Sequence, residues 1–205
     1  MAEKDLAAGS PPRTGAGAPA EYFASLARAQ GFETVAALEP ATLEFLPEVR
    51  EMCAADRCRS YGKNWSCPPA CGSLEDWKAR CGRYQRGLLL QTVGEREDSW
   101  DFEAMEEAAL RNRERVDALA EALLADGADF LFLAAGTCTR CETCTYPDAP
   151  CRFPEKLFPS MEACGLFVSK VCADNGVAYY YGDDKIAYTC CLLFQAQALP
   201  ESAAR

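Results

Sequence analysis

The sequence predicts an α/β fold, in which helices pack on a mixed β-sheet of about four to five strands. Apolar runs of strand length alternate with helical patterns in the middle of the chain, which is the order typical of this class. Two segments rich in Cys, Pro and Gly interrupt that order and are expected to be metal-binding loops at the ends of elements. An α+β arrangement is the alternative, since the last two expected strands follow each other directly.

The length and composition indicate one domain. The chain has 205 residues, of which 49% are apolar, which is enough for one buried core. Residues 1–19 are rich in Ala, Gly and Pro and are expected to form a disordered tail. We therefore expect a single metal-binding domain over residues 20–195, followed by a frayed C-terminus at 196–205.

Turn residues divide the first half of the chain into elements. We expect, in order, a helix at 20–30, a strand at 33–38, a segment of undecided structure at 41–51 and a helix at 73–81. Pro47 leaves the third segment undecided because proline interrupts a helix interior. Ser73 is a suitable N-cap for the helix at 73–81, and Gly82 follows the end of that helix.

The second half contains the clearest helical pattern. Small or apolar side chains of residues 99–126 recur at three- and four-residue gaps, broken only by Asn112, at Phe102, Met105, Ala109, Val116, Leu119 and Leu123. A helix at 161–173 is expected to begin after Ser160 as its N-cap. Strands are expected at 86–93, 129–134, 177–181 and 186–194, the last two forming a hairpin.

The charge and hydropathy of the chain exclude several partners. The net charge is −10 and the isoelectric point is about 4.6, so neither nucleic acid nor an anionic membrane is an expected partner. No apolar run is long enough to span a bilayer, and no signal-peptide pattern opens the chain. We therefore expect a cytoplasmic protein.

Cysteine and histidine usage defines the chemistry. The chain has thirteen cysteines and no histidine. In a reducing cytosol, dense cysteine indicates metal ligation or redox chemistry and not a disulfide framework. Without histidine there is no Cys-His dyad, no mixed Cys/His zinc site and no Rieske centre. Thiolate-only sites bind zinc, iron–sulfur clusters or Cu(I).

The second cysteine loop has the spacing of an iron–sulfur motif. Three cysteines at two-residue gaps repeat the first part of a bacterial ferredoxin motif, and a fourth follows, giving Cys138, Cys141, Cys144 and Cys151. Zinc sites more often use two separated pairs of cysteines. We therefore predict a [4Fe–4S] cluster in this loop. A zinc site is the first alternative, and a loop without metal is the second.

The first cysteine loop, residues 53–72, carries Cys53, Cys58, Cys67 and Cys71. Cys67 is followed by Pro68, as is the remote fourth ligand of a ferredoxin motif. Each loop therefore holds its own cluster, which is the simpler assignment, or Cys67 completes the cluster of the other loop. A tight surface loop without metal is the structural alternative.

The cysteines outside both loops are expected mainly in the core; they are Cys81, Cys164, Cys172, Cys190 and Cys191. The last two are adjacent in a strand, so they are expected on its opposite faces.

Four motifs together resemble a known family. They are Cys58-x2-Tyr61-Gly62-x2-Trp65-Ser66-Cys67-Pro68-Pro69-x-Cys71-Gly72, Gly136-x-Cys138-x2-Cys141-x2-Cys144, Pro150-Cys151-Arg152-x-Pro154 and Pro159-Ser160-Met161-Glu162-Ala163-Cys164-Gly165. In this order they resemble the cysteine-rich predicted metal-binding proteins with domain of unknown function 2284, found largely in anaerobic bacteria and archaea. The resemblance spans about residues 50–182 and implies that the loop cysteines from Cys58 onward are ligands. Cys53 is the loosest part of the match.

Three functions follow from these patterns. The first is a protein with one or two [4Fe–4S] clusters that transfers electrons or serves a redox partner protein as an accessory. The second is a cluster-dependent enzyme of unassigned substrate, which an incomplete set of three cysteines would favour. The third is a zinc-stabilised binding module.

Overall fold

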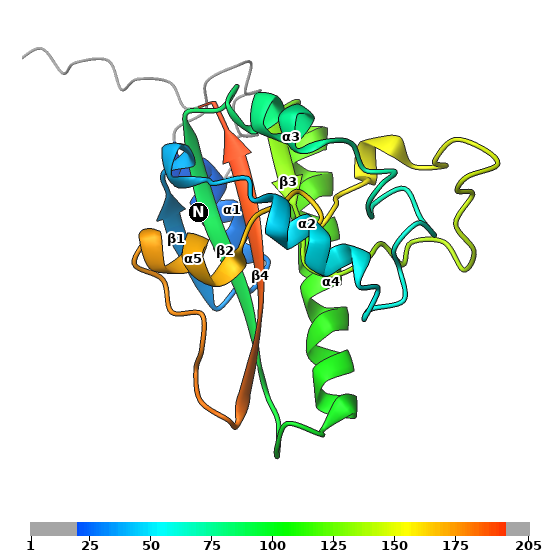
Figure 1. Ribbon diagram of the computed structural model, residues 1–205. Helices are drawn as coiled ribbons and strands as arrows, with labels where there is room; N and C mark the ends of the chain where they lie inside the picture. The colour runs from blue at the N-terminus through cyan, green and yellow to red at the C-terminus, as the bar shows by residue number, and fades with distance from the viewer. Residues whose placement is uncertain (1–19, 196–205) are drawn as a thin grey trace, which may run out of the picture.

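The computed structural model describes residues 20–195, and the expectations for 1–19 and 196–205 lie outside these described residues. The strands in this part of the chain form one sheet in the order β1-β2-β4-β3 (Figure 1). The strands are β1 (Thr34–Leu38), β2 (Arg86–Glu95), β3 (Phe130–Leu133) and β4 (Lys185–Phe194). The α-helices are α1 (Ala20–Ala29), α2 (Pro47–Ala54), α3 (Leu74–Cys81), α4 (Phe102–Ala125) and α5 (Val168–Asp174).

The sheet contains a split βαβ unit. β4 pairs with β2 on one side and β3 on the other, and both pairings are antiparallel. β2 and β3 therefore run in the same direction, and α4 connects them across the face of the sheet. The predicted fold class is confirmed, with neighbouring strands antiparallel throughout the described sheet.

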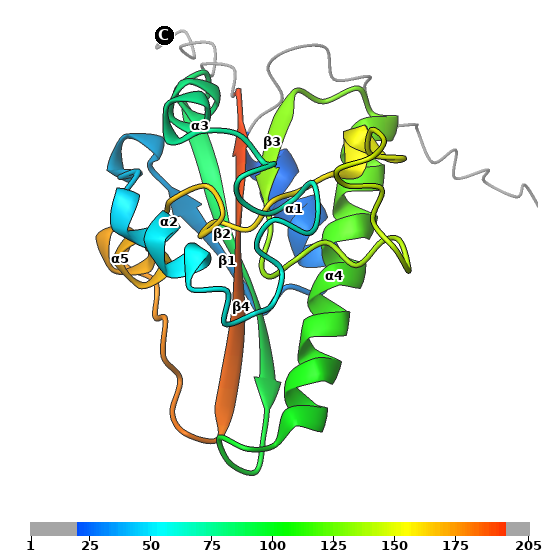
Figure 2. The ribbon, with the colours of Figure 1, turned by 45° about the vertical axis from the view of Figure 1, so that its right-hand side comes forward.

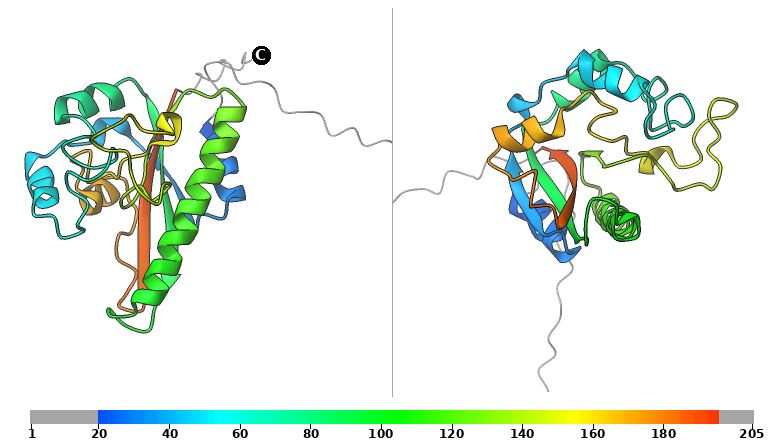
Figure 3. Two further views of the ribbon diagram at one scale, coloured as in Figure 1. Left: turned by 90° about the vertical axis from the view of Figure 1, so that its right-hand side faces the viewer. Right: turned by 60° about the horizontal axis from the view of Figure 1, so that its bottom comes forward.

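Helices cover both faces of the sheet, and each face has its own apolar core (Figure 3). Leu90 and Cys190 face α1 and α4, whereas the next residues along each strand, Leu89 and Cys191, face α3 and α5. The two-residue period of a strand produces this division. The placement of Cys190 and Cys191 on opposite faces is therefore confirmed.

The first-half elements follow their sequence signals. α1, β1 and α3 form where expected. The Ser73 hydroxyl accepts a hydrogen bond from Asp76 N at 3.1 Å, and Ser73 N donates one to the Asp76 carboxylate at 2.9 Å, which makes a capping box. In the undecided segment, Pro47 is the first residue of α2, a position where its missing N–H has no cost.

The apolar face of α4 differs from the prediction. The helix begins at Phe102 with Asp101 as N-cap, and Phe102 is 65% exposed. Asn112, which breaks the apolar pattern, is only 1% exposed and donates to Cys190 Sγ at 3.5 Å. Which α4 side chains are buried depends on where the helix crosses the sheet. The first turn of α4 extends beyond the core, so Phe102 is exposed.

Two expected elements are wrong in extent or type. The helix expected at 161–173 begins only at Val168, because Gly165 has φ +91° and cannot continue a helix. Residues 177–181 form no strand; β4 pairs with β2 along its whole length and with β3 over 191–194. Instead, Ala178 O accepts a hydrogen bond from Gln91 Nε2 at 2.9 Å.

A bilayer crossing requires a long apolar helix. None of the helices within residues 20–195 meets that requirement.

Candidate metal centre

The second cysteine loop leaves the sheet directly after β3 and returns to the same point. Ala134 N donates to Pro159 O at 2.8 Å and Met161 N donates to Ala134 O at 3.1 Å, so the base of the loop is closed. Arg152 Nη1 donates to Thr143 O at 2.9 Å within the loop. The loop is therefore a compact excursion on the rim of the sheet (Figure 2).

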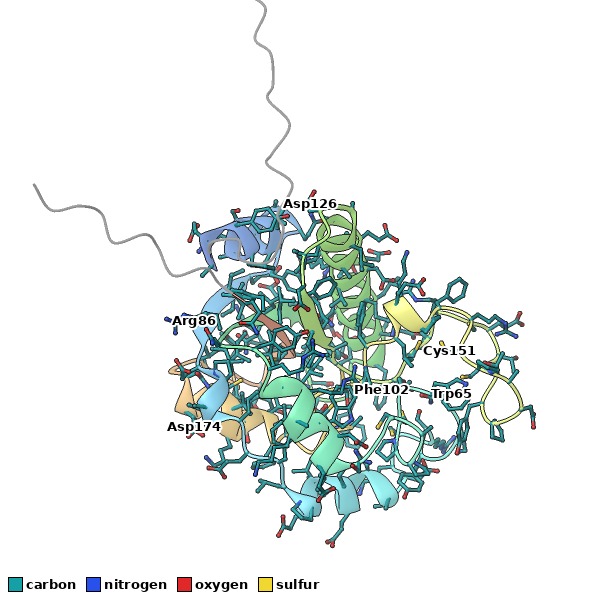
Figure 4. The ribbon with its side chains drawn as sticks, turned by 90° about the horizontal axis from the view of Figure 1, so that it is seen from above. Trp65, Arg86, Phe102, Asp126, Cys151 and Asp174 are labelled. Carbon is teal, nitrogen blue, oxygen red and sulfur yellow. The ribbon has the colours of Figure 1, made fainter. Side chains whose placement is uncertain are left out.

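All four predicted ligands of this loop lie around one space. Cys138, Cys141, Cys144 and Cys151 line a single cavity of about 20 Å³. Trp65, from the first loop, lies on its wall, and Figure 4 shows Trp65 and Cys151 on the same side of the molecule. The assignment of these four cysteines as metal ligands stays a prediction, and the structure places all four on the wall of one cavity.

The first cysteine loop begins at the end of α2 and is shaped by turns. Asp56, with φ +49°, accepts a hydrogen bond from Tyr61 N at 2.8 Å, and Gly62 N donates to Pro68 O at 2.8 Å. Both bonds fold the segment between Cys58 and Cys67 back on itself. As a result Cys53, Cys58 and Cys67 line a second, larger cavity of about 320 Å³.

Cys71 is not among the residues that line this cavity. Its Sγ lies 3.5 Å from Ala163 O and 3.7 Å from Arg50 Nη1, and the residue is 9% exposed. Arg50 also donates to Gly72 O at 2.7 Å and to Ala163 O. Three of the four first-loop cysteines thus line one cavity, and the fourth lies against Ala163, which lines the same cavity.

The two loops are joined by a buried polar contact. Cys138 N donates to the Ser66 hydroxyl at 3.0 Å, and Asn64 Nδ2 donates to Thr137 Oγ1 at 2.9 Å. Cys67 Sγ lies 3.4 Å from the same Thr137 hydroxyl. Ser66 and Asn64 are both buried. The first loop is therefore a wall of the second loop's site, and the two cavities are neighbours.

Burial keeps the thiols protonated before any metal binds. It raises the pKa of Cys53 to about 11, with Glu162 adding to the shift and Arg50 opposing it. Burial likewise raises the pKa of Cys71 and Cys138, opposed by Arg50 and Arg140 respectively. A metal bound by these cysteines would have to displace the protons, so such binding would release protons and strengthen as pH rises.

Several cations in and beside the loops pair with acidic side chains. Lys63 Nζ lies 3.4 Å from Asp56 Oδ2, Lys156 Nζ lies 2.6 Å from Glu121 Oε1, and Arg140 pairs with Asp117. In the described part of the chain, no three Cys, Asp or Glu side chains converge closely enough to hold a single metal ion. The ligand assignments of both loops therefore remain predictions.

Sequence reasoning missed the residues that orient the loops. Arg50 lies on α2, outside both cysteine segments, and only the fold brings it to Cys71. Asn64, Ser66 and Thr137 join the loops although nothing in their spacing indicates a contact. Of these three, only Ser66 is a named position in the motifs of the family resemblance, and the motif gives it no role.

The remaining cysteines pack in the core as predicted. Cys81, Cys164, Cys172 and Cys191 belong to the core on the α3 and α5 face, and Cys190 to the other.

Comparison with known proteins gives a family match. The chain matches the family model described as Predicted metal-binding protein (DUF2284) over residues 36–194. Searches of curated proteins and of solved structures each found no match.

Proposed function

The chain belongs to this family of predicted metal-binding proteins, and on that premise we propose that it is an iron–sulfur protein that transfers electrons. Its second loop holds a [4Fe–4S] cluster through Cys138, Cys141, Cys144 and Cys151. A second cluster is held by the first loop. The observation that carries the proposal is the single cavity lined by all four second-loop cysteines.

The donor chemistry supports an iron–sulfur cluster. Four thiols with no histidine match the ligand set of a cubane, and the two-residue gaps match its spacing. The cavity is small, about 20 Å³, so the loop must widen as a cluster is assembled. The base of the loop is closed by hydrogen bonds at Ala134 and Pro159, so the widening falls on the cysteine-bearing turns and requires the Arg152 bond to Thr143 O to adjust.

The surroundings support a redox role. A bound cluster would gain and lose one electron without any bond to the protein being made or broken. Trp65 covers the site and donates to Ala149 O at 3.0 Å, which excludes water from one side. Arg140, Arg152 and Lys156 line the same cavity, and positive charge beside an anionic cluster raises its reduction potential.

The two loops together favour transfer between two centres and a partner. The Ser66 and Thr137 contacts join the two sites, so electrons have a short route from one to the other. The partner is a redox protein that docks beside the second loop, where Phe153 is 40% exposed. A cytosolic location accords with the dense cysteine content, because thiolate ligands persist in a reducing compartment.

The test is metal analysis of full-length protein purified without oxygen. We expect about four or eight iron atoms per chain with matching sulfide and a broad visible absorption. Cys141→Ala should remove one cluster, or about four iron atoms per chain, whereas Cys172→Ala, a core cysteine outside both loops, should keep the full iron content. Stoichiometric zinc with little iron after reconstitution, or unchanged iron in Cys141→Ala, would contradict the proposal.

A further inference from the structure

One buried donor in the second loop has no acceptor. Arg140 Nε is buried and makes no hydrogen bond, and within residues 20–195 it is the one buried side-chain nitrogen or oxygen in that condition. A buried N–H group without an acceptor is costly and therefore rare. A bound ion or cofactor that accepts the bond is one of the regular explanations for such a group.

The side chain of Arg140 belongs to the wall of the second-loop cavity. It lines this cavity together with all four second-loop cysteines. Burial raises the pKa of Cys138, and Arg140 opposes that shift through its backbone N–H and its positive charge, so Arg140 lies close to the Cys138 sulfur. The donor without an acceptor therefore belongs to a residue of the proposed cluster site.

We propose that Arg140 Nε donates a hydrogen bond to a sulfur ligand of the second-loop cluster and thereby sets the reduction potential of that cluster. Asp117 on α4 is the positioning residue that holds the guanidinium for this bond. This inference rests on the proposed function, since it needs a cluster in the second loop. It goes further because it selects one of the three cations around the cavity and assigns it a directed bond.

The charges around the cavity favour a sulfur acceptor. Three cations line it, and no carboxylate is among its lining residues in the described part of the chain; the cations are Arg140, Arg152 and Lys156. The groups on this wall that can become negatively charged are the thiols. A charged donor forms its strongest hydrogen bonds with a charged acceptor. A sulfur ligand of a bound cluster would therefore supply the acceptor that Arg140 Nε lacks.

The other two cations of the wall are already engaged. Arg152 Nη1 donates to Thr143 O at 2.9 Å, and Lys156 Nζ lies 2.6 Å from Glu121 Oε1. Among the residues that the structure describes, neither side chain has a buried nitrogen without a partner. Arg140 is therefore the cation of this wall whose buried donor is still available.

Asp117 fixes the direction of the Arg140 guanidinium. α4 passes beside the second loop (Figure 2), and Arg140 Nη2 donates to Asp117 Oδ1 on this helix. Because the guanidinium is rigid and planar, a bond that fixes Nη2 also limits where Nε can point. A hydrogen bond to a cluster sulfur stabilises the more negative, reduced state and so raises the reduction potential. The Arg140–Asp117 pair thus tunes the cluster from a helix outside both loops.

The first test detects the hydrogen bond itself. The full chain is labelled with arginine that carries ¹⁵N only at Nε, purified without oxygen, reduced and examined by pulsed EPR. We expect hyperfine coupling between the cluster and an arginine Nε. Arg140→Lys should remove this coupling, and Arg152→Lys, which changes a cation on the same wall, should keep it. An iron-loaded wild type without the coupling, or coupling that persists in Arg140→Lys, would overturn the proposal.

The second test is a redox titration of the same iron-loaded proteins. Arg140→Lys keeps the positive charge but loses the directed donor, so the reduction potential of the second-loop cluster should fall. Arg152→Lys is the matched control and should change the potential less, since Arg152 already donates to Thr143 O. An unchanged potential in Arg140→Lys would overturn the role of this bond in setting it.

Asp117→Ala and Glu121→Ala test the positioning role, and they do so even if Arg140→Lys assembles no cluster. Both residues lie on α4, one turn apart, with side chains that are 41% and 59% exposed, so both variants should fold. Each variant removes one negative charge from the helix. Only Asp117→Ala should weaken the Nε coupling, and its potential should be the lower of the two. Equal coupling in both variants would overturn the role of Asp117.

The two proposals fail in different ways. A wild-type chain without iron would overturn the proposed electron-transfer function and this inference with it. An iron-loaded chain without arginine coupling would overturn this inference alone.

Discussion

At the scale of single residues, Arg50 does more than any other side chain to connect the segments around the first loop. Its guanidinium donates to Gly72 O at 2.7 Å and to Ala163 O, and one nitrogen lies 3.7 Å from Cys71 Sγ. It thereby ties α2, the end of the first loop and the 160–165 segment together. Hydrogen bonds from a charged group to partly buried carbonyls are among the stronger ones in proteins.

Arg50→Ala should lower the free energy of unfolding by about 1–3 kcal/mol, because two carbonyls lose their donor. Urea denaturation measures this difference. Arg28→Ala is the control: its pair with Glu21 has side chains that are 54% and 75% exposed, and its loss should change stability by less than about 0.5 kcal/mol. Equal effects of the two substitutions would show that Arg50 does not join these segments.

The buried core thiols make stability depend on alkaline pH. Burial raises the pKa of Cys81 and of Cys190 to about 12, from a usual value of 9.0. Between these values the unfolded chain has lost the thiol protons and the folded chain retains them. The stabilisation is therefore fully present below pH 9.0 and is lost as pH rises toward 12.

We predict that the urea midpoint falls steadily as pH is raised from 9 toward 11, a window set by the shift of Cys81 from 9.0 to about 12. In Cys81→Ala the fall should be shallower, since one shifted thiol is gone, although the variant is less stable at pH 8 through its lost packing. A pH profile of Cys81→Ala parallel to that of the wild type would contradict this account.

At the scale of elements, the packing of α4 on β2 depends on a glycine. A Cβ atom at Gly94 would lie 2.6 Å from Ala108 Cβ and 3.3 Å from Ile186 Cγ2. Ala108 is fully buried on α4, so its Cβ cannot turn aside. Gly94 thus allows the helix to lie close to the sheet.

Gly94→Ala should cost about 1–3 kcal/mol of stability by overpacking this contact. Ala108→Gly alone should cost about 1 kcal/mol through helix propensity. Because Ala108→Gly removes the clashing atom, the double variant should be more stable than the sum of the two losses predicts. A double-mutant cycle by urea denaturation measures this coupling, and strict additivity would contradict the close approach.

At the scale of the whole molecule, two cores share one sheet. Leu89 and Leu90 are adjacent and fully buried, one in the core with α3 and α5, the other in the core with α1 and α4. Both cores depend on the same strands, so neither can lose its packing without exposing the other. We therefore expect the predicted single domain to unfold as one cooperative unit.

Leu89→Ala and Leu90→Ala should each cost about 2–5 kcal/mol, the usual loss for a buried leucine. Fluorescence of Trp77, in the first of these cores, and far-UV circular dichroism should report one coincident transition in both variants. Leu124→Ala, at a position that is 39% exposed on α4, should change stability by less than about 0.5 kcal/mol. Separate transitions by the two probes would indicate two independently folding units.

Local signals predicted the elements whose structure depends on local geometry. The capping residue Ser73 acts on the nearest turn, so the sequence alone indicates it. Pro47 left residues 41–51 undecided, because a proline can either interrupt a helix or open one, as it does in α2. The opposite faces of Cys190 and Cys191 follow from the two-residue period of a strand. Asn112 and Phe102 could not be placed this way, since their burial depends on where α4 crosses the sheet.

The sequence by itself determined the fold class, the cysteine-rich loops and the exclusion of histidine chemistry, because composition, spacing and periodicity are properties of the chain alone. Only the tertiary structure decided which groups share a site. It brought Trp65 to the second loop, it placed three first-loop cysteines on one cavity, and it set Arg50 of α2 beside Cys71. The physical reason is that these contacts join segments far apart in the chain, and they exist only once both cores have packed on the sheet.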